Sequence, residues 1–164
     1  MQTKYLIVDN SAGGIGAAEA IRQVDEAGAL TIVSEQSYPA YSGPLISKYL
    51  ARQCTLGQIL FRPHDFYNQN NVLFLPGKRV TQVEPSHQSV QLDNGERINW
   101  EKVLLALGGK PIFPKMKGSA KRGVFAFTKL DDAETVDRFL DNAGKSVVTG
   151  GGLIGISVTE APVK

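Results

Sequence analysis

The order of residue types at the start of this 164-residue chain constrains its fold more than any other feature. Residues 6–8 are a short aliphatic run, typical of a buried parallel strand, and a cluster of small residues follows them. Residues 15–22 are rich in helix-forming types. Residues 30–33 are a second aliphatic run, with Glu35 shortly after it. Strand, glycine turn, helix, strand and acid in this order predict a βαβ unit, and therefore an α/β fold.

A βαβ unit of this kind can bind a dinucleotide. The N–H groups at the start of the helix bind the pyrophosphate, small residues let the backbone approach it, and Glu35 accepts a hydrogen bond from a ribose hydroxyl. Read from Asp9, the fingerprint of three glycines becomes Asp9-x-Ser11-x-x-Gly14, so only the third glycine is present. The carboxylate of Asp9 would repel the pyrophosphate. An ordinary βαβ crossover without a ligand therefore stays open as the alternative.

The fingerprint occurs a second time near the end of the chain. Residues 145–149 are typical of a buried strand, and Gly150, Gly152 and Gly155 follow with the spacing of an unbroken fingerprint. A helix is expected to begin at this place. Two strand-glycine-helix units make two dinucleotide sites the most economical interpretation.

A short-chain dehydrogenase is a further hypothesis, suggested by Gly14-Ile15-Gly16. The spacing excludes it, because that motif needs three residues between its first glycine and Gly-x-Gly, and Asp9 to Gly14 leaves four. In addition, none of the five tyrosines is followed by a lysine four residues later, so the catalytic tyrosine–lysine pair of that class is absent from the sequence.

The residues between the two fingerprints predict a mixed sheet. Asp93-Asn94-Gly95 lies between two short strands of alternating type and is a strong hairpin signal. The strands around it predict an antiparallel meander, after which residues 103–107 return to a buried parallel strand. The predicted helices cover residues 45–51, a short segment that begins near Asp65, and residues 130–140. Phe66 and Tyr67 are expected to anchor the segment near Asp65 in the core. The other predicted strands cover residues 71–75, 80–83, 89–92, 97–100 and 124–127.

Composition excludes several classes of partner and site. The formal net charge is +2 and the basic residues are dispersed, so we expect neither nucleic acid nor an anionic membrane as a partner. No signal sequence is recognisable, which indicates a cytoplasmic protein. Cys54 is the only cysteine and is interpreted as a half-buried apolar residue, not a nucleophile. His64 and His87 have no ligand-spaced neighbours, so no metal site is predicted.

Motifs in a fixed order extend over essentially the whole chain. They are Asn10-Ser11-Ala12-Gly13-Gly14-Ile15, the segment from Tyr38-Pro39-Ala40-Tyr41 to Lys48-Tyr49-Leu50, Asp65-Phe66-Tyr67, Leu104-Leu105-Ala106-Leu107-Gly108-Gly109-Lys110-Pro111, Leu130-Asp131-Asp132-Ala133, and Gly150 to Gly155. In order and spacing they resemble the FAD-dependent pyridine nucleotide-disulfide oxidoreductases, in the branch without an active-site cysteine pair. That branch includes NADH-dependent rubredoxin and ferredoxin reductases and the flavin portion of NADH-dependent nitrite reductases.

The resemblance implies a flavin enzyme. In a complete enzyme, a hydride passes from NAD(P)H to FAD, and electrons then pass to a small redox protein or another acceptor. Glu35 would lie at the FAD ribose, and the backbone of Val80 would pair with the adenine. Lys48 would lie near the isoalloxazine ring and is the catalytic residue that the resemblance implies. The cofactor-binding residues that it implies are Asn10, Ser11, Ala12, Gly13, Gly14, Glu35, Lys48, Val80, Ala106, Leu107, Gly108, Gly150, Gly152 and Gly155.

The sequence departs from the family pattern at four positions. Asp9 replaces the first glycine of the phosphate-binding turn, and Gly43 stands where the family usually has an arginine that reaches the FAD. Leu107 stands where the strand usually ends in Ala-Thr-Gly, and Ser157 where an acid commonly faces the nicotinamide. Since three of these changes degrade the FAD site, a non-catalytic module kept for binding or assembly is the second hypothesis.

The resemblance also implies a truncated FAD/NAD(P)-binding fold, with a Rossmann-like parallel sheet and an antiparallel β-meander. Residues 1–112 would be the N-terminal part of the FAD-binding domain, with the meander at about 79–100. Residues 113–143 would be a linker and a helix, and residues 144–164 the opening strand and turn of an incomplete NAD(P)-binding domain. We therefore expect little or no NADH turnover from this chain alone. We also expect a homodimer, or a chain that completes the fold, to cover the apolar surface of the sheet.

Overall fold

The computed structural model describes residues 1–141 and 143–161. The chain forms two compact units, each built from two separate stretches of sequence. The first unit contains Met1–Tyr41 and Leu60–Gly108, and the second contains Ser42–Ile59 and Gly109–Lys164. This grouping follows contacts rather than chain order, and the linear division into a cofactor domain, a linker and a second domain stays a prediction.

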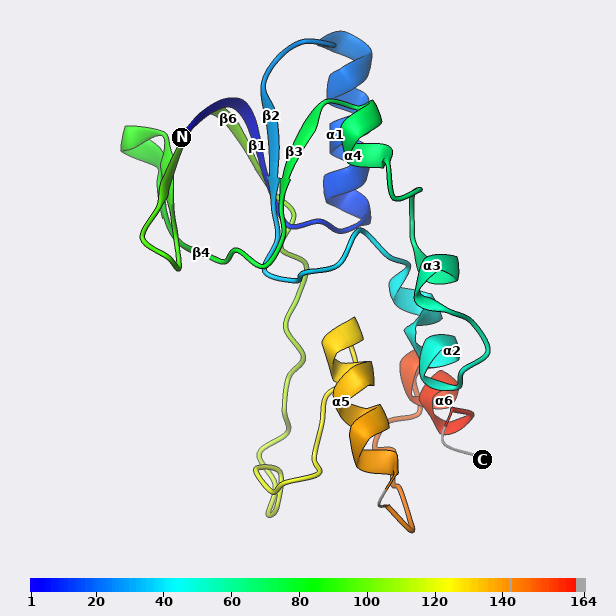
Figure 1. Cartoon of the computed structure of the whole chain (residues 1–164). Helices are drawn as coiled ribbons and strands as arrows, with labels where there is room; N and C mark the ends of the chain where they lie inside the picture. The colour runs from blue at the N-terminus through cyan, green and yellow to red at the C-terminus, as the bar shows by residue number, and fades with distance from the viewer. Residues whose placement is uncertain (142, 162–164) are drawn as a thin grey trace. The chain divides into compact units, whose positions relative to one another are not determined.

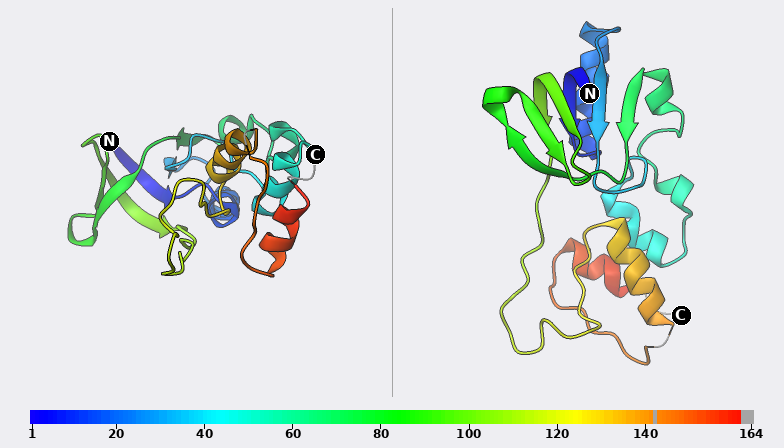
Figure 2. Two further views of the ribbon diagram at one scale, coloured as in Figure 1. Left: turned by 90° about the horizontal axis from the view of Figure 1, so that it is seen from below. Right: turned by 60° about the vertical axis from the view of Figure 1, so that its left-hand side comes forward.

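The first unit contains a six-stranded mixed sheet (Figures 1 and 2). Its strands are β1 (Gln2–Val8), β2 (Leu30–Val33), β3 (Val72–Leu75), β4 (Val80–Glu84), β5 (Ser89–Leu92) and β6 (Arg97–Leu105). They lie in the order β3-β2-β1-β6-β5-β4. β1 pairs in parallel with β2 and β6, and β2 with β3, whereas β5 is antiparallel to both β4 and β6. The predicted fold class, a parallel sheet with an antiparallel meander, is confirmed.

Both faces of β1 are buried against apolar side chains. On one face, α1 (Ala12–Val24) and α4 (Phe66–Gln69) pack in a core cluster that includes Ile7 of β1 (Figure 1). On the other face, Leu6 and Val8 pack against residues of β5 and β6. Because successive side chains of a strand point to opposite faces, a strand buried on both faces has no polar alternation. This explains the uninterrupted aliphatic run at residues 6–8.

The structure joins two predicted strands into one. The sequence predicts separate strands at residues 97–100 and 103–107, whereas β6 is continuous over Arg97–Leu105. Its first residues pair with β5 while most of the strand pairs with β1, so its two neighbours run in opposite directions without a break. The second half is also not buried as predicted, since Leu104 and Leu105 are 40% and 49% exposed. Leu104 pairs with Ile7 and Leu105 with Val8, so the two leucines lie on opposite faces of the sheet, and neither of these two core clusters contains them.

The second unit is helical in its described residues. It contains the 3₁₀ turn η1 (Gly43–Leu45) and the helices α2 (Ile46–Leu50), α3 (Leu56–Ile59), α5 (Leu130–Leu140) and α6 (Leu153–Thr159). α5 has the predicted bounds, and its first-turn acids suit the positive end of the helix dipole. Leu50, Ala133 and Ala161 form the buried centre of the unit. No helix in the described part of the chain is both long and apolar enough to cross a membrane.

Two strands that the sequence predicts in this unit do not form. Residues 124–127 and 145–149 have no strand assignment, and Val147 is 90% exposed. A strand is stable only when a neighbouring strand pairs with its backbone groups, and all six strands of the described residues belong to the first unit. The aliphatic run before Gly150 therefore has no sheet to join here.

Candidate functional site

The turn after β1 lies at the point where the strand order of the sheet reverses. The chain leaves β1 toward β2 on one side, while β6 lies on the other side of β1. The N–H of Ala106, just after β6, donates to the carbonyl of Val8 over 3.0 Å, and the hydroxyl of Ser11 donates to the carbonyl of Ala106 over 3.4 Å. In open α/β sheets, ligands bind outside the carboxyl ends of the strands at such a switch point. The structure thus brings the predicted residues after β1 and after β6 together.

The start of α1 has no side-chain cap. Ser11 is the N-cap residue, has an extended conformation, and makes no capping hydrogen bond through its side chain. The first intrahelical bond runs from the N–H of Ile15 to the carbonyl of Ser11 over 2.9 Å. The N–H groups of Ala12, Gly13 and Gly14 precede that bond and have no intrahelical acceptor. Such groups, at the positive end of a 13-residue helix, can bind an anion such as a pyrophosphate.

Glycine is required at only one of the two central positions of the turn. A Cβ on Gly14 would overlap the carbonyl oxygen of Asp9, so no side chain fits there. A Cβ on Gly13 would meet the Cβ of Ala106 at 3.7 Å, which is an ordinary contact. Asp9 itself has φ +92°, a conformation that glycine adopts easily and that other residues adopt at a cost. The backbone therefore has the shape of a three-glycine turn even where the sequence has Asp9.

The second fingerprint forms the same local turn in the second unit. Gly150 has φ +122°, Gly152 is the extended N-cap residue of α6, and the N–H of Ile156 donates to the carbonyl of Gly152 over 3.0 Å. A Cβ on Gly155 would overlap the carbonyl oxygen of Gly150. Gly150 and Gly155 therefore have the same relation as Asp9 and Gly14. The two turns confirm each other as helix-start turns of one type.

A polar network of largely buried groups is bonded to Asn10 in the first turn. The hydroxyl of Tyr67, in α4, donates to Oδ1 of Asn10 over 2.9 Å and accepts the N–H of Ala40 over 3.0 Å. The Nδ2 of Asn10 donates to the carbonyl of Tyr38 over 3.2 Å. Burial raises the pKa of Tyr67, and the hydrogen bonds from Ala40 and to Asn10 act in the opposite direction.

The sequence predicts Tyr67 only as an apolar anchor of the core. The packing part of this prediction is correct, because Tyr67 belongs to the core cluster and stacks on Phe74. The hydroxyl of Tyr67 is the feature of the sequence from which this polar contact could have been predicted. A buried tyrosine usually needs a hydrogen-bond partner, so a tyrosine where phenylalanine would pack equally well indicates a polar neighbour.

The other predicted residues of the first unit lie nearer to the surface. Glu35 follows β2 with its side chain 59% exposed, and Nε of Arg79 lies 4.0 Å from its Oε1. Val80 is half-buried at the start of β4, where its backbone pairs with Leu92. Leu107 is 63% exposed, and Gly108 has φ +62°. Arg79 is an additional cation beside Glu35 that the sequence reasoning did not single out.

Lys48 and the departures at Gly43 and Ser157 belong to the second unit. Lys48 is exposed on α2. Gly43 and Ser157 line one largely apolar cavity of about 380 Å³, together with Pro44, Ile46, Ser47, Phe127, Thr128, Leu153, Ile154 and Val158. Two positions that the sequence marks separately are therefore neighbours in space.

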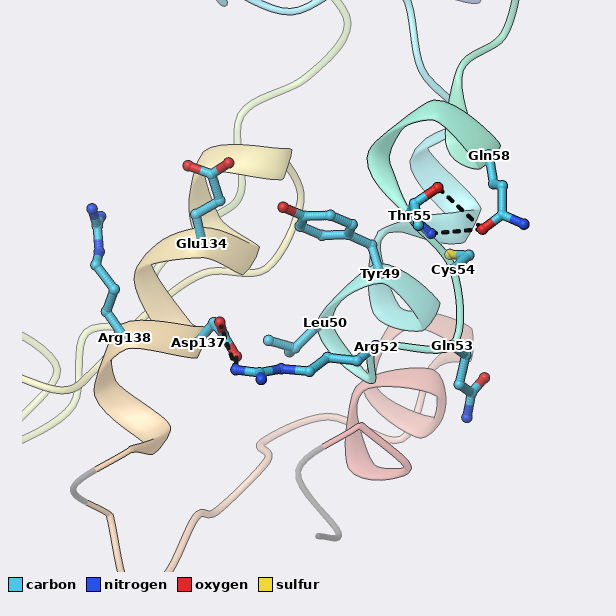
Figure 3. Close-up of a pocket in the computed structure, with 10 residues that line it drawn as sticks. All are labelled: Tyr49, Leu50, Arg52, Gln53, Cys54, Thr55, Gln58, Glu134, Asp137 and Arg138. Carbon is cyan, nitrogen blue, oxygen red and sulfur yellow. Dashed lines mark hydrogen bonds and ion pairs between the residues drawn. The ribbon is translucent and has the colours of Figure 1, made fainter.

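A second cavity, of about 550 Å³, has a mixed lining of polar and apolar side chains (Figure 3). Arg52, after α2, reaches Asp137 of α5 with 3.4 Å between Nη2 and Oδ2. Cys54 lies in the same wall, next to Thr55, whose N–H and hydroxyl both donate to Oε1 of Gln58. None of the predicted cofactor residues lines this cavity.

Comparison with known proteins relates nearly the whole chain to one family. Residues 3–163 match the model of a family described as pyridine nucleotide-disulphide oxidoreductase. The NADH-rubredoxin oxidoreductase of Clostridium acetobutylicum is 29% identical over 97% of this chain and 41% of its own length. Putidaredoxin reductase of Pseudomonas putida is 31% identical over 97% of this chain and 39% of its own length.

The structural comparison agrees. The crystal structure of the Clostridium acetobutylicum NADH:rubredoxin oxidoreductase has a TM-score of 0.89 and 27% identity, over 99% of this chain and 42% of that one. The putidaredoxin reductase of a covalent complex with putidaredoxin has a TM-score of 0.80 and 25% identity, over 98% of this chain and 40% of that one. The chain thus spans about 40% of the length of these two relatives.

Proposed function

We propose, from the premise that this chain belongs to the pyridine nucleotide-disulphide oxidoreductase family, that it is the FAD-binding portion of an NAD(P)H-dependent flavoprotein reductase. One observation carries the proposal for FAD. The turn after β1 has uncapped helix N–H groups, a glycine that no side chain could replace, and the end of β6 beside it. These features fit the adenosine diphosphate part of FAD.

The residues of the first unit would divide the binding of FAD between them. The N–H groups of Ala12, Gly13 and Gly14 would bind the pyrophosphate, with Ser11 beside them. Glu35 would accept a hydrogen bond from the adenosine ribose. The backbone of Val80 would pair with the adenine, and Asn10, Ala106, Leu107 and Gly108 would complete the walls.

The second unit would contribute to the redox end and to the nicotinamide nucleotide. Lys48 would place a cation near the isoalloxazine ring, and Gly150, Gly152 and Gly155 would bind the NAD(P)H pyrophosphate in a complete protein. FAD, when bound, supplies the hydride and single-electron chemistry, and the protein supplies position and electrostatic field. The electron acceptor would be a small redox protein, as the names of relatives such as rubredoxin reductase indicate for those proteins.

A binding or assembly role without catalysis is the second candidate. The observation that favours it is the combination of Asp9 in the first turn, Gly43 in the apolar cavity and the exposed side chain of Leu107. We further propose a homodimer or a completing chain as the partner of the exposed end of β6, where Leu104 and Leu105 lie.

The visible absorption spectrum of the purified chain tests these functions. FAD is added, free FAD is removed by desalting, and the flavin bands are measured before and after. Bands that survive desalting support the FAD-binding function. A spectrum without flavin bands, with all added FAD in the small-molecule fraction, refutes that function and favours the assembly role. We expect little or no steady NADH-dependent dye reduction by the 164-residue chain in either case.

A further inference from the structure

We infer that Tyr67 is a positioning residue for the cofactor turn: its hydrogen bond to Asn10 holds the turn in the conformation in which the first amides of α1 face the pyrophosphate. This inference rests on the proposed FAD binding. It assigns to Tyr67 a role that its packing in the core does not require. Its hydroxyl is bonded to the turn through Asn10, so its effect on the cofactor is indirect.

The conformation of the turn requires stabilising contacts from other parts of the chain, because its own backbone is strained and has no side-chain cap. Asp9 has a positive φ of 92°, which costs conformational free energy for a residue with a Cβ. Ser11 provides no side-chain cap. A cap on the first N–H groups of α1 would stabilise the turn, but it would occupy the groups that an anion must bind. Support must therefore come through a side chain that leaves those N–H groups free, and Asn10 lies between Asp9 and Ser11.

Asn10 is held at both ends of its amide group. Its Oδ1 accepts from Tyr67 and its Nδ2 donates to the carbonyl of Tyr38, so its side chain points toward the loop after β2. Asn10 is 8% exposed, so water does not replace these partners easily. With the side chain fixed at two atoms, the backbone on either side of it has little freedom to rotate.

Tyr67 is a rigid support for this contact. Its ring stacks on Phe74 with 4.3 Å between centroids and 9° between planes, and it meets Phe66 edge-on at 5.4 Å. Its hydroxyl donates to Asn10 and accepts from Ala40 at the same time. Phenylalanine would fill the same space, but it would leave Oδ1 of Asn10 and the N–H of Ala40 without this partner. The substitution Tyr67→Phe therefore removes the positioning contact and keeps the packing.

Tyr5→Phe is the matched control. Tyr5 is also a tyrosine of the first unit, and its hydroxyl donates to Oδ2 of Asp25 over 3.0 Å, at the opposite end of α1 from the turn. Both substitutions remove one hydroxyl with a hydrogen bond, so both are expected to lower the melting temperature modestly. Only Tyr67→Phe is expected to weaken FAD binding, by about tenfold in Kd, as the loss of one buried hydrogen bond predicts.

The experiment measures three quantities for the full chain and each variant. They are the Kd for FAD by fluorescence titration, the melting temperature without FAD, and the hydrogen-exchange rates of the amides at residues 10–15. Tyr67→Phe is expected to raise the Kd and to accelerate this exchange, and Tyr5→Phe to change neither. In Asn10→Ala, the Tyr67→Phe substitution is expected to have no further effect on Kd, because both changes remove the same contact.

Two results would overturn the inference. The first is a Tyr67→Phe variant with a lower melting temperature but with unchanged Kd and turn exchange, which would assign Tyr67 to core packing alone. The second is an equal loss of FAD affinity in Tyr5→Phe. If the wild-type chain binds no FAD, the proposed function fails separately. The exchange rates of residues 10–15 in the two variants then still decide whether Tyr67 holds the turn.

Discussion

Asp9 allows the electrostatic and the conformational cost of this cofactor turn to be separated. It occupies the position of the first fingerprint glycine, with φ +92°, where the second turn has Gly150 with φ +122°. Asp9→Asn removes the charge but keeps the Cβ and a side chain that tolerates positive φ well. Asp9→Gly removes the charge and the conformational strain together. Both variants remove the charge, but only Asp9→Gly also removes the strain. Comparing their affinities for FAD therefore shows which of the two weakens binding.

The two contributions have different sizes. For two unit charges about 6 Å apart, repulsion is about 0.7 kcal/mol at the dielectric constant of water and about 3 kcal/mol at an effective value of about 20. Asp9→Asn is therefore expected to lower the Kd for FAD by a factor between about 3 and about 100. The strain that Asp9→Gly relieves, about 1–2 kcal/mol, is partly offset by the greater freedom of glycine in the unfolded chain, about 0.5–1 kcal/mol. We expect the stability of Asp9→Gly without FAD to rise by at most about 1.5 kcal/mol.

The assay is fluorescence titration of FAD against the wild type and both variants at low salt and at about 1 M salt, where the Debye length is about 3 Å. An electrostatic cost predicts that both variants gain affinity at low salt and that the gain shrinks at high salt. If Asp9→Asn has the wild-type Kd at low salt while Asp9→Gly binds more tightly, the cost is conformational and the electrostatic argument is wrong. If neither variant changes the Kd, this turn does not hold the pyrophosphate, and the site must be reassigned.

Three further predictions concern the stability of the first unit, measured by urea or thermal unfolding. Gly14→Ala should destabilise the first unit by about 1–3 kcal/mol, because the added Cβ would overlap the backbone. Gly16→Ala should stabilise it by about 0.5–1 kcal/mol, because Gly16 is an exposed helix residue with open space for a Cβ. Equal effects of the two substitutions would contradict the turn geometry. The hydrogen bond from Lys4 is the largest cause, ahead of the N–H of Gly28, of the lowered pKa of Asp25. Because the folded pKa lies below the unfolded value of 3.8, ionised Asp25 stabilises the fold above pH 3.8, and this stabilisation is lost as the pH falls through the folded pKa. The loss of melting temperature in Asp25→Asn should therefore be largest near neutral pH and should shrink below about pH 4. A loss of melting temperature that does not depend on pH would contradict this prediction. Arg22→Lys should cost about 1–3 kcal/mol, since lysine cannot reproduce a guanidinium that donates to four backbone carbonyls, and a wild-type unfolding midpoint would contradict this.

The sequence determined the elements whose stability is local or whose pattern reflects burial on both faces. β2 and α5 have the predicted bounds, and the aliphatic run of β1 is buried as predicted. The positions of both helix-start turns were also predictable. In each turn, the residue that faces the carbonyl of the first turn position has no room for a Cβ, so glycine occurs there at a fixed spacing in the sequence. Gly14 and Gly155 have this constraint in the structure.

Only the tertiary structure decided what depends on neighbours distant in sequence. Residues 145–149 are as aliphatic as β1, yet they form no strand, because strand formation requires a paired partner that local sequence does not encode. In β6, by contrast, two predicted strands form one continuous strand, because it pairs with β1 on one side and with β5 on the other. The hydrogen bond between Tyr67 and Asn10 joins residues 57 positions apart. A pattern of residue types indicates that a side chain is buried, but only the folded chain decides which polar atom its hydroxyl meets.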